Sequence, residues 1–158
     1  MNLINLVHSH YNISLVEQLR YLDVLKFLED TKQKIYVVGA GGSGSNTLDR
    51  LFELGINGIN TVAMNTDAKH LLRVRANKKL ILGKKTAGGR GAGSNPQVGE
   101  EAAKESAEEI KQLISDGSLV FITCGMGGGT GTGSAPIIAE QAKSAGALTV
   151  SVVTLPFT

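Results

Sequence analysis

Six glycines fall within the nine residues from position 125 to position 133, a density that the interior of a helix or strand does not tolerate. Two smaller clusters, at 39–44 and 88–93, contain four glycines each. Together the three clusters hold fourteen of the chain's 20 glycines. The excess of glycine is therefore confined to three short segments, and the fold must explain why the backbone there needs to lack side chains.

The overall composition excludes several classes of protein. Collagen requires glycine at every third position, which this sequence lacks, and a disordered chain would have fewer than the 42% hydrophobic residues found here. No apolar stretch approaches the ~20 residues of a membrane-spanning helix, and residues 1–13 lack the pattern of a signal peptide. Because Cys124 is the single cysteine, no internal disulfide can form. We expect a soluble cytoplasmic protein without direct membrane insertion.

Residues 1–33 are predicted to form an N-terminal extension. Ser14 and Glu17 have the spacing of a capping box, and leucines then recur every three or four residues as far as position 28. This pattern predicts an amphipathic helix over 14–30.

Residues 34–158 are predicted to form a second domain, in which short apolar runs alternate with helical patterns. The strand candidates are 35–38, 61–64, 79–82, 119–123 and 148–153. A helix is expected from Asn95-Pro96 to about Gly117, and another over 134–145. Nearly all-apolar strands that alternate with helices indicate an α/β fold, a Rossmann-like parallel sheet with helices on both faces. Such sheets bind ligands at the carboxyl ends of their strands, where all three glycine clusters lie.

A glycine loop between a strand and a helix favours an anionic ligand, because backbone amides can approach it closely and the helix N-terminus points at it. Three such loops at one edge favour a polyanion such as a nucleoside triphosphate. The segment 39–44 also fits the dinucleotide fingerprint G-x-G-x-x-G, so an NAD(P)-binding oxidoreductase domain is the alternative. A Walker phosphate loop is excluded, since no Gly-Lys-Ser/Thr triplet follows any glycine cluster.

The third cluster contains the most specific motif. Residues 127–133 read GGGTGTG and are preceded by FITCGM, and four further segments accompany them, at 38–46, 65–67, 91–96 and 152–157. In this order they resemble the tubulin/FtsZ family of GTPases, whose signature is GGGTG[ST]G, and within it the FtsZ branch of prokaryotic cell-division proteins. The resemblance covers residues 35–158, and the leucine-rich extension is most similar to archaeal members.

The resemblance implies that the domain binds GTP or GDP, with Mg²⁺ accompanying the nucleotide. The implied site residues, in chain order, are Gly42, Ser43, Gly44, Ser45, Asn46, Asn65, Asp67, Ala92, Gly93, Gly127, Gly128, Gly129, Thr130 and Gly131. The first five would contact the phosphates and sugar, and Asp67 would act through magnesium or water. Ala92 and Gly93 would sense the γ-phosphate, and the last five would wrap the phosphates.

The resemblance further implies a filament-forming protein of the division site that hydrolyses GTP at subunit junctions and contacts membrane-tethering division proteins. In the family the base-binding and hydrolytic loops follow the position of Thr158. We therefore expect this chain to be the truncated N-terminal part of the GTP-binding domain. No catalytic residue or protein metal site is assigned within it, and the chain alone is expected to be inactive.

Other reactive or charged residues are predicted to be bystanders. Cys124 is expected to be a small buried residue, and His70 an exposed one. Seven of the sixteen Lys and Arg residues lie within positions 73–90. We expect them to form a solvated rim beside the anionic ligand rather than a nucleic-acid site, because no aromatic residue is interleaved for base stacking.

Overall fold

The computed structural model describes residues 20, 22–27 and 31–156, and divides into two compact units, Met1–Lys32 and Gln33–Thr158. In the first unit, residues 22–27 are helical. The rest of the helix predicted over 14–30 lies mostly outside the described residues, so the assignment of 1–33 as an extension stays a prediction.

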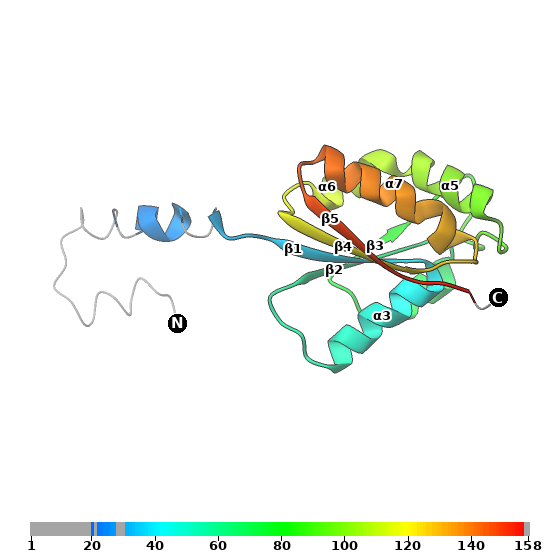
Figure 1. Ribbon diagram of the computed structural model, residues 1–158, viewed down its shortest axis with the longest axis horizontal. Coiled ribbons are helices and arrows are strands. Elements are labelled where there is room, and N and C mark those ends of the chain that lie inside the picture. Colours follow the sequence, from blue (N-terminus) through cyan, green and yellow to red (C-terminus); the bar gives the residue numbers. More distant parts are fainter. Residues whose placement is uncertain (1–19, 21, 28–30, 157–158) are drawn as a thin grey trace. The chain divides into compact units, whose positions relative to one another are not determined.

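The second unit contains a five-stranded parallel sheet in the order β3-β2-β1-β4-β5, which confirms the predicted fold class (Figure 1). Its elements are β1 (Ile35–Ala40), α3 (Gly41–Glu53), β2 (Asn60–Asn65), α4 (Ala68–Arg73), β3 (Lys78–Ile81), α5 (Pro96–Glu105), α6 (Ala107–Ile114), β4 (Leu119–Gly125), α7 (Thr130–Ser144) and β5 (Leu148–Thr154).

The side chains of alternate residues in each central strand pack into two separate hydrophobic cores, one on each face of the sheet. In β1, Val38 packs in the core under α5, α6 and α7, while its neighbour Val37 packs with Leu48 of α3 and Leu71 of α4. Figure 1 shows α3 on the opposite face from α5, α6 and α7. Helices on both faces explain why the central strands are apolar throughout.

The helix predicted from Asn95 to Gly117 is in fact two helices, α5 and α6, interrupted at Ser106. The Ser106 hydroxyl accepts a hydrogen bond from the Gly83 amide at 3.0 Å. Glu105 accepts hydrogen bonds from the amides of Lys85 and Thr86 at 3.0 and 2.9 Å. The loop after β3 therefore hydrogen-bonds to the chain at the break between α5 and α6. Hydrophobic periodicity cannot predict such a long-range contact.

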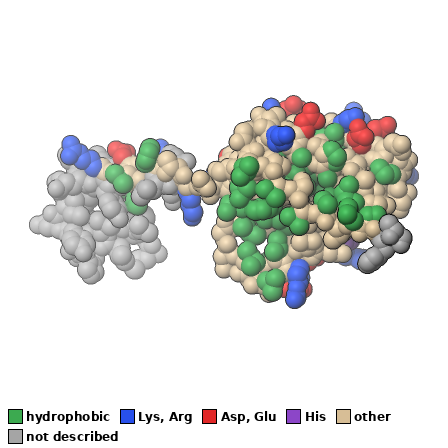
Figure 2. Space-filling view, viewed as in Figure 1, with side chains coloured by type: hydrophobic (Ala, Val, Ile, Leu, Met, Phe, Trp, Pro, Cys, Tyr) green, Lys and Arg blue, Asp and Glu red, His purple; other side chains and the backbone are tan. Residues whose placement is uncertain are grey.

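The edge strand β5 and the residue that follows it expose apolar side chains. Leu148, Val152 and Leu155 are 68%, 58% and 76% exposed. Figure 2 shows hydrophobic side chains gathered on the face along which β5 runs in Figure 1. Among the described residues, no helix is long and apolar enough to cross a membrane.

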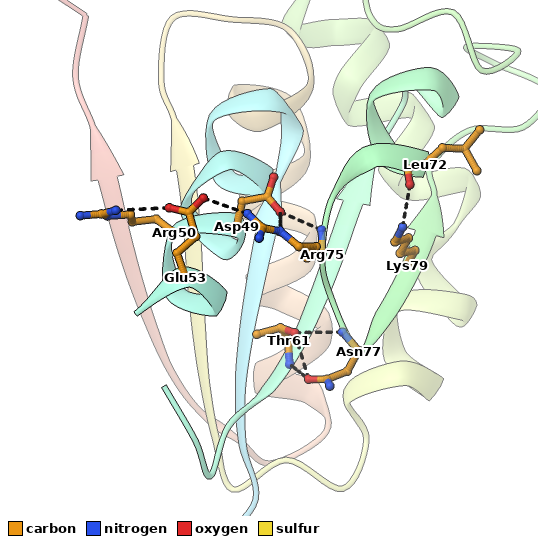
Figure 3. Close-up of polar contacts among 8 residues, drawn as sticks. All are labelled: Asp49, Arg50, Glu53, Thr61, Leu72, Arg75, Asn77 and Lys79. Atoms are coloured by element: carbon orange, nitrogen blue, oxygen red, sulfur yellow. Dashed lines mark hydrogen bonds and ion pairs between the residues drawn. The ribbon is translucent and has the colours of Figure 1, made fainter. Parts of the chain in front are cut away.

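Arg75 connects the segment between α4 and β3 to α3 (Figure 3). Its backbone amide donates to Asp49 Oδ1 at 2.8 Å, and its guanidinium donates to Asp49 at 3.2 Å and to Glu53 at 2.9 Å. The same guanidinium lies 4.9 Å from the centre of the Phe52 ring. Thr61 and Asn77 link β2 to the residues before β3 through their own hydrogen bonds.

We predict that Asp49→Asn lowers the free energy of unfolding at pH 7 by about 0.5–1 kcal/mol. The Arg75 amide, followed by its guanidinium, holds the pKa of Asp49 below its usual range. A lowered folded-state pKa stabilises the protein above the unfolded pKa of about 3.9, and this contribution is lost as the pH falls through the folded value. Urea unfolding at pH 7 and pH 3 measures this difference, which should shrink at pH 3.

The control for this experiment is Glu101→Gln, since the exposed Glu101 lies beyond the first turn of α5 and forms no ion pair with any described residue. It should leave the free energy of unfolding unchanged at both pH values. A loss in Asp49→Asn that stays constant between pH 7 and pH 3 would show that the Arg75 contact does not depend on the charge of Asp49.

Candidate phosphate-binding site

The candidate site lies where the strand order reverses, between the neighbouring strands β1 and β4. The helix after β1 covers one face of the sheet and the helix after β4 covers the other (Figure 1). Their diverging connections leave a crevice at the carboxyl ends of the strands, the usual ligand position in this class of sheet. A cavity of about 380 Å³ occupies it, lined by Ala40, Gly42, Ser43, Ala92, Ser94, Gly125, Met126, Gly128, Gly129, Thr130, Gly131 and Thr154.

The two helices that begin at this cavity lack the usual side-chain caps. Asp67 caps α4 and Asn95 caps α5 through side-chain hydrogen bonds, and α6 has two glutamates in its first turn. Within the described part of the chain, α3 and α7 have neither a side-chain cap nor an acidic residue in the first turn. Their first amides and the positive ends of their dipoles are therefore available to an anion in the cavity.

The glycines near the cavity fall into two physical classes. A methyl group added at Gly42 or Gly128 would meet no heavy atom within 4 Å, so these positions leave space in front of the backbone. Both residues line the cavity. Space and free amides together allow a phosphate group to approach the main chain directly.

The second class of glycine allows backbone to pack on backbone. A methyl group at Gly44 would overlap the carbonyl oxygen of Thr123 in β4, and one at Gly133 would overlap that of Pro96 in α5. One at Gly99 of α5 would overlap the carbonyl oxygen of Gly129. These contacts bring α3 against β4, and α5 against α7, at the cavity walls.

Of the fourteen predicted site residues, seven line the cavity: Gly42, Ser43, Ala92, Gly128, Gly129, Thr130 and Gly131. Gly44 and Ser45 are buried in the first turns of α3, and the Ser45 hydroxyl has no hydrogen-bond partner among the described residues. Asn46, Gly93 and Gly127 are exposed nearby in sequence, while Asn65 and Asp67 flank the β2–α4 connection.

Sequence reasoning did not assign Ala40, Ser94, Gly125, Met126 or Thr154, which also line the cavity. Ser94 has a φ of 59°, a left-handed conformation unusual for a residue other than glycine. Its place between Gly93 and Asn95 was a signal that could have drawn attention to it. Thr154 comes from the end of β5, and its carbonyl accepts a hydrogen bond from the Met126 amide at 2.8 Å.

The β2–α4 connection is tied to the cavity wall by Thr66. Its buried hydroxyl hydrogen-bonds with that of Thr130 in the first turn of α7. The Thr66 carbonyl accepts a hydrogen bond from Gly91 at 3.1 Å, just before the cavity residue Ala92. The loop that follows β2, the loop before α5 and the start of α7 are thereby joined.

One expectation about a bystander residue is wrong. His70 is half-buried rather than exposed, and its ring nitrogen Nδ1 lies 3.2 Å from the side-chain amide nitrogen of Asn65. None of the seven Lys and Arg residues between 73 and 90 is among the cavity-lining residues, and a solvated rim beside the ligand stays a prediction for them. Two of the seven form ion pairs: Arg75 pairs with Asp49 of α3, and Lys84 with Glu109 of α6.

Cys124 has the predicted buried position at the end of β4. It is 1% exposed, and its sulfur lies 3.8 Å from that of Met126. Burial raises the pKa of the Cys124 thiol, which disfavours the reactive thiolate. The structure therefore supports a packing role for this residue.

Comparison with known proteins identifies the family. The sequence matches the family described as "Tubulin/FtsZ family, GTPase domain" over residues 34–158. The chain belongs to the Tubulin/FtsZ family. Relatives include "Cell division protein FtsZ 1" of Methanocaldococcus jannaschii, 63% identical over 135 residues. The protein with the same description from Thermococcus kodakarensis is 60% identical over 136 residues.

These matches cover 85% and 86% of this chain but 37% and 36% of the relatives, so the chain spans little more than a third of their length. Among solved structures, an "FtsZ dimer, empty" from M. jannaschii superimposes with a TM-score of 0.79 at 59% identity. That match covers 92% of this chain and 41% of the other. CetZ from Methanosaeta thermophila superimposes with a TM-score of 0.68 at 25% identity, covering 80% of this chain and 37% of the other.

Membership of this family leaves the NAD(P)-oxidoreductase alternative without support. Its sequence basis was the glycine pattern at 39–44. In the structure Gly39 and Gly44 of that pattern pack on each other, since a methyl group at Gly39 would lie 2.5 Å from the Gly44 carbonyl oxygen. The tight strand-to-helix turn thus accounts for two of its three glycines without a dinucleotide.

We predict that Gly133→Ala lowers the free energy of unfolding by about 2 kcal/mol or more, because α5 and α7 must separate to admit the methyl group. Helix propensity alone predicts the opposite, a gain of about 1 kcal/mol on replacing a glycine inside a helix. The control is Gly42→Ala in α3, whose methyl group meets no heavy atom within 4 Å and should not destabilise the fold. Urea unfolding of both variants tests this, and equal stabilities would contradict it.

Proposed function

We propose that this chain is the phosphate-binding part of a GTP-dependent, filament-forming cell-division protein that hydrolyses GTP at the junctions between its subunits. The observation that carries the proposal is the pair of uncapped helices, α3 and α7, whose N-termini converge on one cavity at the switch point of the sheet. An anion there interacts with two helix dipoles and two sets of free amides at once. A phosphate chain fits this arrangement, and membership of a GTPase family supports GTP or GDP as the nucleotide that carries it.

Magnesium would accompany the nucleotide and neutralise part of the charge of its phosphates. The described residues contain no group of three His, Cys, Asp or Glu side chains that could hold a metal ion by themselves. Asp67 Oδ1 already accepts a hydrogen bond from the His70 amide as the cap of α4. Its second carboxylate oxygen would reach the ion, directly or through water, which fits a metal held chiefly by phosphate oxygens.

In our proposal, GTP hydrolysis and filament assembly require groups in addition to those of residues 1–158. The chain contributes the phosphate-binding loops, and a neighbouring subunit would complete the hydrolytic site, so residues 1–158 alone would bind GTP without turning it over. Self-association is supported by the solved "FtsZ dimer" from M. jannaschii, which this chain resembles. Location at the division site and contacts with membrane-tethering proteins follow from the same proposal.

Titration of the natural full-length protein with GTP and, separately, with NADPH tests the nucleotide assignment. We expect GTP to bind and NADPH not to bind. Gly128→Val should abolish GTP binding, because its side chain would fill the open space in front of the third glycine cluster. The backbone φ of Gly128 lies outside the left-handed region, so valine there should not strain the main chain.

The control variant is Gln112→Ala, at an exposed polar position of α6 and away from the cavity-lining residues. It should bind GTP as the unsubstituted protein does. Failure of the unsubstituted protein to bind GTP, or undiminished GTP binding by Gly128→Val, would contradict the proposed function.

A further inference from the structure

We propose that His70 is a positioning residue of the nucleotide site: its Nδ1 accepts a hydrogen bond from the side-chain amide of Asn65 and so fixes the loop between β2 and α4. The inference rests on the proposed function, because it takes Asn65 and Asp67 as part of the site that holds GTP. It goes beyond that function by assigning a role to a histidine outside the glycine loops.

The hydrogen-bond donors determine which nitrogen of His70 carries the proton. The backbone amide of Asp67 can only donate, and it lies 3.2 Å from Asn65 Oδ1, so the oxygen of the Asn65 amide faces Asp67. Asn65 Nδ2 then faces His70 Nδ1 at 3.2 Å. Because this nitrogen of Asn65 is also a donor, Nδ1 of His70 must be unprotonated and the ring proton must lie on Nε2.

The contacts form a closed set of three residues. Asp67 donates from its backbone to Asn65, Asn65 donates to His70, and the His70 backbone amide donates to Asp67 Oδ1 at 3.0 Å. Asn65 is 3% exposed, so water cannot readily replace a lost partner of its amide. Loss of the His70 acceptor would therefore leave a buried donor unsatisfied and disfavour the observed loop conformation.

The fixed loop has two connections to the cavity. Thr66, between Asn65 and Asp67, hydrogen-bonds through its hydroxyl to Thr130, which lines the cavity. Ala68, which follows Asp67, donates from its backbone amide to the carbonyl of Gly89 at 3.0 Å. Gly89 lies in the segment that leads to the cavity residue Ala92. Hydrogen bonds thus connect the loop that contains Asn65 with the starts of α7 and α5, and a change in the Asn65 amide is transmitted through them.

The test compares GTP affinity of the natural full-length protein with two variants at pH 7.5. His70→Ala removes the acceptor and should weaken GTP binding about tenfold, the order of effect of one unsatisfied buried hydrogen bond. His70→Asn places an amide oxygen where Nδ1 lies and should restore most of the affinity. Equal affinity of His70→Ala and the unsubstituted protein would overturn the inference, and so would failure of His70→Asn to restore binding lost in His70→Ala.

Nitrogen NMR of the His70 ring in the nucleotide-free full-length protein distinguishes failure of this inference from failure of the proposed function. We expect the tautomer with the proton on Nε2 and none on Nδ1. A proton on Nδ1 at pH 7.5 would overturn the inference whether or not GTP binds. If no protein in the series binds GTP while the expected tautomer is observed, the hydrogen bond stands and the nucleotide function fails.

Discussion

The architecture depends on close approach of backbone to backbone at the point where the strand order reverses. Gly44 allows α3 to lie against the carbonyl of Thr123 in β4, and Gly133 allows α7 to lie against the carbonyl of Pro96 at the start of α5. Any side chain at these positions would separate the elements. With them in contact, α3 and α7 begin on either side of one cavity and aim their N-termini at it.

The same constraint explains why the glycines of the clusters have two structural roles. Cluster glycines that face another backbone, such as Gly44 and Gly133, determine the position of the cavity walls. Glycines that face open space, such as Gly42 and Gly128, leave room for a ligand at those walls. The helices α3 and α7 also lack side-chain caps, whereas Asp67 caps α4 and Asn95 caps α5. The positive N-terminal ends of α3 and α7 therefore face that open space without a compensating side chain.

Local signals in the sequence predicted much of the fold. Asn95 and Pro96 begin α5 as their cap and first-turn preferences require. The features that sequence missed depend on long-range contacts: the break at Ser106 is joined to Gly83, and His70 is held by the fold against Asn65. The helix expected to begin at 134 begins at Thr130, because the glycine run itself forms its first turn.

Hydrogen–deuterium exchange of the full-length protein with and without GTP tests most directly whether the two uncapped helix N-termini bind one anion. GTP should slow exchange of the amides at the starts of both α3 and α7, in peptides covering residues 41–45 and 128–132. The start of α6, which has its own acidic first turn, should not change. Protection at α3 alone, or at neither helix, would contradict a shared phosphate site.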